Sequence, residues 1–234
     1  TTLVIILLSL LGVPLFAIIG LAALVSFYGA EIDSAAIFIE LYRVASNPSL
    51  IAIPLFTLSG FILAHGNAPE RLTRVSQSFL RGIPGGIPLA ILMACAFFTS
   101  LTGASGVTII ALGGLLYPLL LKEKYGENFS LGMITSSGSI GLLFPPSLPL
   151  ILYGLIAQIS IDKLFIAGIV PGLIMILFVS IFSITHSKKS YEVFNWSTAK
   201  SALIEAGWEL PLPFIITIGI YGGFFTVTEA ASVT

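Results

Sequence analysis

The sequence predicts an all-α polytopic membrane protein, and three observations lead to this fold class. Of its 234 residues, 56% are hydrophobic and only 9% are charged, with a mean hydropathy of +1.07, whereas soluble domains carry about 25% charged residues. The charged residues are confined to short segments between apolar runs. The longest run, residues 83–121, holds 39 residues without Asp, Glu, Lys or Arg, well beyond the ~20 that a transmembrane helix needs.

Four elements are expected before this run. The first is a span over residues 2–28, interrupted only by Gly12 and Pro14 and lacking the features of a cleaved secretory signal. An interfacial helix at 32–44 and a second span at 48–64 follow. The fourth element is a basic amphipathic connector at 65–81, whose helix begins near Asn67 with Pro69 in its first turn.

The 83–121 run is predicted to enter the membrane and return to the same side, as two spans or as a re-entrant hairpin. Basic residues flank it at both ends (Arg71, Arg74 and Arg81 before it, Lys122 and Lys124 after it), and such clusters favour the cytoplasmic side. With a cytoplasmic N-terminus, this topology leaves eight of the ten Lys and Arg residues in the cytoplasm, all except Arg43 and Lys163. The middle of the run, residues 99–108 (TSLTGASGVT), is small and hydroxyl-rich, as expected for a hairpin tip that lines a polar cavity.

The next apolar segment, residues 129–159, is predicted to be a broken transmembrane helix. It is interrupted at 136–139 (SSGS) and again at 144–149 (FPPSLP), where three prolines remove backbone donors and exclude a regular helix. Three further elements are expected after it: a span at 163–184, an interfacial helix at 191–209 anchored by Trp196 and Trp208, and a final span at 211–225.

A hydroxyl-rich hairpin tip together with a proline-broken span indicates the binding site of a secondary transporter, where helix ends and unwound carbonyls meet near the middle of the membrane. The alternative is ordinary helix packing through small residues. The single Cys95 lies in an apolar run and is expected to be a small core residue.

At these two features the chain resembles the large membrane subunit of tripartite ATP-independent periplasmic (TRAP) transporters. The hairpin segment 97–106 (FFTSLTGASG) and the break 138–149 (GSIGLLFPPSLP) carry the resemblance. Shorter motifs at 53–56 (IPLF), 167–172 (AGIVPG) and 225–231 (FTVTEAA) follow in the same order, with Val227 where the family usually has proline. Members of this family are about twice as long and contain two inverted repeats, so the chain is expected to hold the first repeat and the opening of the second.

The resemblance implies a subunit, not an enzyme, that imports a carboxylate-bearing solute across the bacterial inner membrane by sodium symport with an elevator motion. The expected partners are a small membrane (Q) subunit, a periplasmic solute-binding protein, the carboxylate solute and the lipid bilayer, with no nucleic acid. Residues 1–82 and 161–226 would belong to the scaffold. Residues 83–160 would belong to the transport domain, and residues 227–234 would begin the second repeat.

Neutral oxygens suffice to bind sodium, and the sequence offers two groups of them. The hydroxyls of Thr99 and Thr102 share one helix face, and the carbonyls around Gly141, Phe144 and Pro146 are freed by the proline break. These positions also match the first sodium site of the family. The alternative is that both hydroxyls bond back to their own helix.

A solute carboxylate is expected at the hairpin tip, because backbone donors at the start of a helix favour an anion. The residues predicted to bind it are Gly103, Ser105 and Thr108. Ser139 and Ser147 are candidate neighbours of solute or ion that are more simply explained by bonds to the local backbone.

Three other function classes are open to the sequence. Residues 103–106 (GASG) match the G-x-S-G serine motif of intramembrane proteases, but chemistry there needs a base beside the serine, and His65 and His186 both lie at span ends. A channel also uses re-entrant loops and backbone oxygens. A purely structural membrane subunit is the third class.

Overall fold

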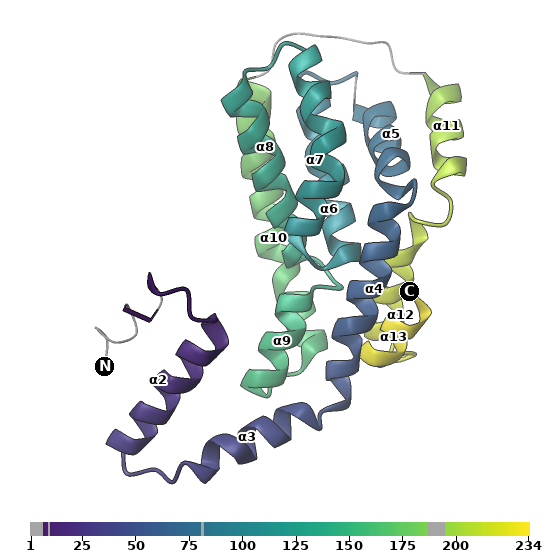
Figure 1. Cartoon of the computed structure of the whole chain (residues 1–234). Helices are drawn as coiled ribbons and strands as arrows, with labels where there is room; N and C mark the ends of the chain where they lie inside the picture. Colours follow the sequence, from purple (N-terminus) through teal and green to yellow (C-terminus); the bar gives the residue numbers. More distant parts are fainter. Residues whose placement is uncertain (1–6, 9, 81, 187–194) are drawn as a thin grey trace. The chain divides into compact units, whose positions relative to one another are not determined.

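The computed structural model describes residues 7–8, 10–80, 82–186 and 195–234, and in these ranges every regular element is a helix (Figure 1). The elements are α2 Leu15–Gly29, α3 Ala35–Ala45, η1 Pro48–Ile51, α4 Ala52–His65, α5 Ala68–Leu80, α6 Gly86–Thr102, α7 Ser105–Lys122, α8 Glu127–Ile140, η2 Gly141–Leu143, α9 Leu148–Ala157, α10 Ile161–Thr185, α11 Trp196–Glu205, α12 Pro211–Tyr221 and α13 Val227–Val233.

Among the described residues, three helices are long and apolar enough to cross a membrane: Pro48–His65, Ser105–Lys122 and Ile161–Thr185. A fourth candidate is the pair Glu127–Leu143 and Leu148–Ala157, bent by 43° at a short break. These findings confirm the predicted all-α polytopic membrane class.

The chain forms two compact units, Thr1–Asn47 and Pro48–Thr234. In the first unit, α2 begins directly after Pro14, and α3 coincides with the predicted interfacial helix. Residues 2–6 and 9 of the predicted first span lie outside the described residues. Arg81, Lys188 and Lys189, which entered the prediction of membrane sidedness, also lie outside them.

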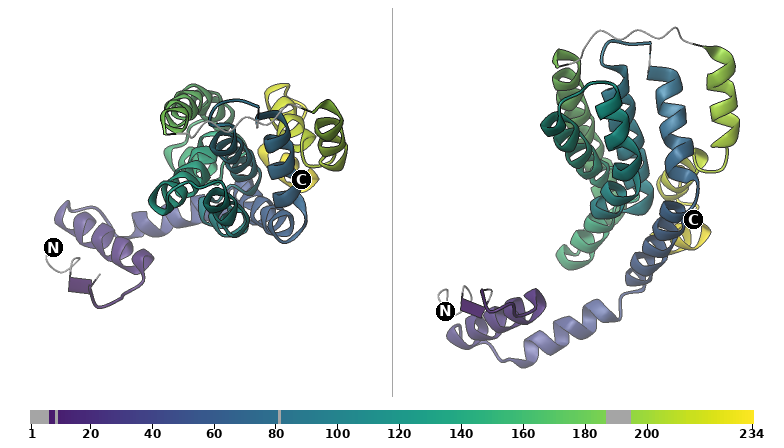
Figure 2. Two further views of the ribbon diagram at one scale, coloured as in Figure 1. Left: turned by 90° about the horizontal axis from the view of Figure 1, so that it is seen from above. Right: turned by 45° about the horizontal axis from the view of Figure 1, so that its top comes forward.

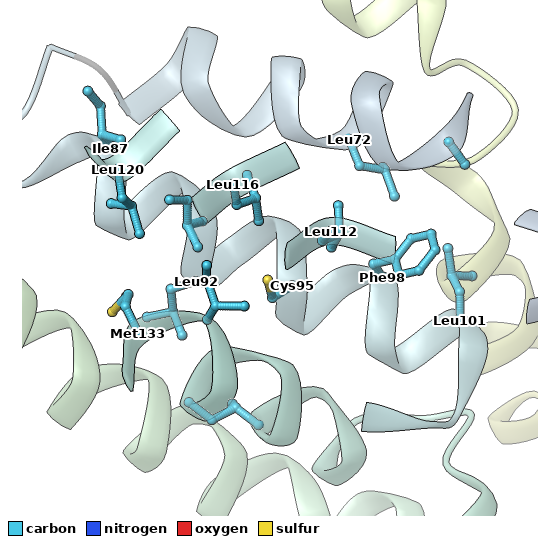
Figure 3. Close-up of a cluster of buried hydrophobic side chains, with 14 residues drawn as sticks. Leu72, Ile87, Leu92, Cys95, Phe98, Leu101, Leu112, Leu116, Leu120 and Met133 are labelled. Carbon is cyan, nitrogen blue, oxygen red and sulfur yellow. The ribbon is translucent and has the colours of Figure 1, made fainter. Parts of the chain in front are cut away.

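The second unit is built around the antiparallel pair α6 and α7, with α8 and α5 packed along α6 (Figures 1 and 2). Their facing side chains form its main apolar core (Figure 3). Buried members from each of these four helices are Leu72, Leu92, Cys95, Phe98, Leu112, Leu116 and Met133. Cys95 is fully buried among them, in agreement with its predicted role as a core residue.

Two ion pairs fasten α5 to α11 and to the segment after it. Arg71 Nη1 lies 2.7 Å from Glu209 Oε1, and the guanidinium of Arg74 pairs with the Glu205 carboxylate. The first pair is the less solvated one, since the Glu209 side chain is only 8% exposed.

The predicted hairpin is a helix–turn–helix. Its arms α6 and α7 run antiparallel, so Gly86 and Lys122 lie at the same end of the pair (Figure 1). Gly103 ends the first arm with φ +65°, a left-handed conformation that glycine adopts without steric cost. Re-entry from one side of the membrane stays a prediction.

The proline break lies where the sequence predicts it. After α8, the chain forms the short turn η2 and then passes through a cis Pro145–Pro146 bond before α9 begins at Leu148. The predicted interruption at residues 136–139 is wrong, because α8 continues to Ile140. The Ser139 hydroxyl donates to the Thr135 carbonyl at 3.2 Å, so this polar run is accommodated inside the helix.

The predicted final span, residues 211–225, is also wrong. Helix α12 ends at Tyr221 after 11 residues, which is about 16 Å at 1.5 Å per residue and half of the hydrocarbon core. Gly222 and Gly223 follow, Gly223 with φ +72°, and α13 begins at Val227 with a capping box between Thr226 and Glu229. The described part of the predicted interfacial helix at 191–209 forms α11.

Candidate functional site

The tip of the hairpin holds a buried cluster of three threonine hydroxyls. Thr99 and Thr108 are fully buried, and Thr102 is 2% exposed. Thr108 Oγ1 lies 2.8 Å from Thr99 Oγ1 and 3.3 Å from Thr102 Oγ1, so it bridges the two arms. Thr99 and Thr102 were predicted to bind sodium and Thr108 to bind solute, and the structure brings all three together.

The cluster extends to backbone oxygens on both sides. The Gly138 carbonyl of α8 lies 3.0 Å from Thr99 Oγ1, and the Ala104 carbonyl at the tip lies 3.5 Å from Thr102 Oγ1 and 3.4 Å from Thr108 Oγ1. Each hydroxyl has a single proton for several acceptors. The cluster therefore has an excess of oxygen lone pairs over donated protons.

Gly141 holds the start of the break against the first arm. A Cβ on Gly141 would lie 2.4 Å from the Ala96 carbonyl oxygen and 2.4 Å from Thr99 Cβ, a distance that only a residue without a side chain permits. The Gly141 carbonyl accepts a bond from Phe144 N at 3.1 Å. Gly141 thus lies beside the threonine cluster, as predicted, while its own carbonyl bonds within η2.

Phe144 and Pro146 are the other two residues whose carbonyls were predicted to bind sodium. The Phe144 ring packs on α10, where a Cβ on Gly172 would be 2.7 Å from the ring. Pro146 is buried in the break. Sodium binding by the carbonyls of these two residues stays a prediction.

Two helix N-termini meet at the hairpin tip, those of α7 and α9. A Cβ on Gly103 would lie 3.3 Å from Leu148 N, the first residue of α9, and 2.6 Å from Leu148 Cγ. Helix N-termini carry a partial positive charge from unpaired amides. Ser105, the first residue of α7, is half-buried at this place. The arrangement suits an anionic group.

Ser147, the residue that precedes α9, carries a buried hydroxyl without a hydrogen-bond partner among the described residues. An unpaired buried hydroxyl costs about 1–3 kcal/mol, so a ligand or water could complete it, as it could the buried hydroxyls of Ser59, Thr73, Ser137 and Ser183. Ser139 differs, since its exposed hydroxyl bonds to its own helix as the simpler interpretation predicted.

Sequence reasoning missed two residues that shape this site. Gly138 supplies a carbonyl to Thr99, and Gly60 of α4 lets the backbone of Thr102 approach, since a Cβ there would be 2.6 Å from Thr102 Cα. Small residues in apolar helices mark close helix contacts, so both glycines carried a signal. That signal did not distinguish them from the other glycines of the chain.

The chemistry of the site is that of neutral oxygens. Among the described residues no group of three or more His, Cys, Asp or Glu side chains comes together. A buried divalent cation would call for carboxylates, whereas hydroxyl and carbonyl oxygens suffice for a monovalent ion. The donor set of the threonine cluster therefore fits Na⁺.

Residues 2–234 match the family model of the tripartite ATP-independent periplasmic transporter, DctM component. The chain belongs to this family. It is 38% identical to the isethionate TRAP transporter permease protein DctMQ of Oleidesulfovibrio alaskensis, over 94% of this chain and 36% of the relative. It is 35% identical to the ectoine TRAP transporter large permease protein TeaC of Halomonas elongata, over 96% and 54%. The C4-dicarboxylate TRAP transporter large permease protein DctM of Vibrio cholerae is 32% identical, over 96% and 51%.

The match confirms the resemblance seen in the sequence to the TRAP large membrane subunit. Members of this family are transport proteins and not enzymes, in agreement with the prediction of a non-enzymatic membrane protein. The chain spans about half the length of the curated relatives it matches.

Proposed function

We propose that the chain forms part of the large membrane subunit of a sodium-coupled TRAP transporter in the bacterial inner membrane, which imports a carboxylate-bearing solute by an elevator motion. Its N-terminus would lie in the cytoplasm. Its partners would be the small membrane subunit and a periplasmic solute-binding protein. The relative named DctMQ supports the first of these partners, because its name joins both subunits.

The observation that carries sodium coupling is the buried cluster of Thr99, Thr102 and Thr108 beside the Gly138 carbonyl. It collects neutral oxygens at the point where the hairpin meets the broken helix. A transmembrane protein places an ion site there when half-helices and unwound backbone face each other.

The acidic solute is supported by the two helix N-termini beside Gly103 and Leu148 and by the unpartnered Ser147 hydroxyl. The names of three relatives contain isethionate, ectoine and C4-dicarboxylate, compounds that each carry a carboxylate or sulfonate group. Gly103 and Ser105 are our candidates for the solute contact, with Ser147 added from the structure. Thr108, from its hydrogen bonds, belongs with the ion.

The test compares the melting temperature of the purified full-length protein in sodium and in potassium. Sodium at ten times its Kd should stabilise the folded state by about 1.4 kcal/mol, and Thr102→Ala should abolish most of this difference. Ser100→Ala is the matched control, since Ser100 is a buried hydroxyl on the same arm that bonds to its own helix at Phe97 O. An equal loss in both variants, or no sodium-selective rise at all, would contradict the proposal.

A channel remains the second candidate, because the same oxygens could line a pore. Uptake into proteoliposomes separates the two functions. A carrier accumulates solute against its gradient when a sodium gradient is imposed, and a channel only equilibrates it.

A further inference from the structure

A cavity of about 310 Å³ lies between α6, the proline break, α10 and α12. Most of its lining side chains are apolar, among them Phe97, Phe144, Leu173 and Phe214, and the rings of Phe97 and Phe214 are tilted by 49° with centroids 6.4 Å apart. The cavity differs from the threonine cluster in its lining, which is mostly apolar. Thr99 and Thr102 of that cluster are buried and do not line the cavity.

The two hydroxyls that line this cavity are already bonded within their own helices. Ser100 Oγ donates to the Phe97 carbonyl at 2.7 Å, and Thr217 Oγ1 donates to the Pro213 carbonyl at 2.5 Å. No charged side chain from the described part of the chain lines it. A polar or charged ligand would lose its hydration there without gaining partners, so the cavity selects an apolar occupant.

The position of the cavity identifies the source of that occupant. Leu173 lies midway along α10, the 25-residue candidate span Ile161–Thr185, at the depth of the hydrocarbon core. The rim side chains Met93, Leu173 and Phe214 are 44%, 55% and 61% exposed. The cavity therefore opens onto the exposed apolar surface of this candidate span.

We infer that this cavity is a binding site for one acyl chain of a membrane phospholipid. The chain would enter between Leu173 and Phe214 and lie against Phe97 and Phe144. This inference needs only the membrane location of α10, and it does not depend on the proposed sodium coupling.

The test uses the full-length transporter in bilayers that contain a phospholipid with a photoactivatable diazirine midway along one acyl chain. Adducts on Met93, Leu173 and Phe214 should exceed those on Ile174 and Leu177 by about threefold or more, the ratio for a preference of about 0.7 kcal/mol. Ile174 and Leu177 are 47% and 58% exposed on the same helix and lie outside the cavity lining.

A cavity-filling variant sharpens the comparison. Leu173→Trp should reduce the adducts on Met93 and Phe214 by about the same factor, whereas Ile174→Trp should leave them unchanged. Equal labelling of rim and control positions in the unmodified protein would overturn the inference. Labelling of Ile174 with none at Met93 or Phe214 would also overturn it, since protein and not lipid would then cover the cavity.

Discussion

The backbone of Thr102 at the hairpin tip lies directly against Gly60 of α4, where an added Cβ would be 2.6 Å from Thr102 Cα. The contact joins the second span of the chain to the threonine cluster. This contact predicts that substitution of Gly60 disturbs the threonine cluster, although α4 contains none of the candidate ligands.

Gly60→Ala should destabilise the protein by about 1–3 kcal/mol, because the added methyl group forces backbone apart in a packed region. Gly114→Ala is the control, since a Cβ on that glycine of α7 meets nothing within 4 Å. Thermal unfolding of both variants in detergent measures the difference. Equal melting temperatures for the two variants would refute the close contact.

Thr99→Val should destabilise the protein by about 1–3 kcal/mol, since it leaves the buried Gly138 carbonyl and Thr108 hydroxyl without their shared partner. Thr135→Val removes an exposed hydroxyl that bonds back to Leu131 O and should change stability by less than about 0.5 kcal/mol. Denaturant unfolding compares the two, and similar losses would argue against a cooperative cluster.

The two ion pairs of α5 should differ in strength. Arg71→Gln leaves the Glu209 carboxylate, which is 8% exposed, without its cation and should destabilise the protein by about 1–3 kcal/mol. The loss should be smaller than the roughly 3–5 kcal/mol of a fully buried pair, because the Arg71 side chain is 39% exposed. Arg74→Gln breaks a solvated pair and should have an effect of at most about 1 kcal/mol.

The double variant Arg71→Met, Glu209→Leu separates charge burial from packing in this prediction. It should recover most of the stability lost in Arg71→Gln, because it removes both charges together. A double variant as unstable as the single one would show that shape and not charge is the cause.

Ser147→Ala should not lower the stability of the protein, and removing a buried hydroxyl that has no partner among the described residues should raise it by up to about 1–3 kcal/mol. Solute uptake should nevertheless fall, if this hydroxyl completes the solute site. Ser139→Ala, which removes an exposed hydroxyl bonded to its own helix, should leave uptake unchanged. Unchanged uptake in Ser147→Ala would remove this residue from the site.

The hairpin topology predicts that cysteines at Gly82 and Lys122 react with a membrane-impermeant thiol reagent from the same side. Both positions are exposed and flank the charge-free run. A cysteine at Lys163 should react from the opposite side. The measurement needs Cys95 replaced, and labelling of Gly82→Cys and Lys122→Cys from opposite sides would exclude the hairpin.

Much of this fold could be predicted because charged residues and prolines constrain the chain at their own positions in the sequence. The charge-free run and its basic flanks predicted the α6–α7 pair, and the prolines at 145, 146 and 149 predicted the break after η2. The errors have the same local origin. The polar run at 136–139 did not interrupt α8, where the Ser139 hydroxyl bonds inside the helix. The glycines at 222 and 223 ended α12 inside an apolar run.

The site was only partly predictable, because its geometry depends on contacts between helices far apart in the sequence. Thr99 and Thr102 were recognised from their spacing on one arm. The carbonyl of Gly138 is 39 residues from Thr99, and nothing in the local pattern marks that pairing. For the same reason, the local pattern did not show that Thr108 of the second arm bonds to the other two threonines.

The glycine contacts around the site restrict how the hairpin and the broken helix can move relative to each other. Gly141 fits against Thr99, Gly103 fits against Leu148, and a Cβ on Gly138 would be 2.7 Å from Ile109 Cγ1 of α7. At each of these three contacts the backbone of a glycine packs against a neighbouring side chain. If the broken helix slid along the hairpin, the backbone and these side chains would clash. If the proposed elevator motion takes place, these contacts require the hairpin and the broken helix to move together, with the oxygen cluster between them.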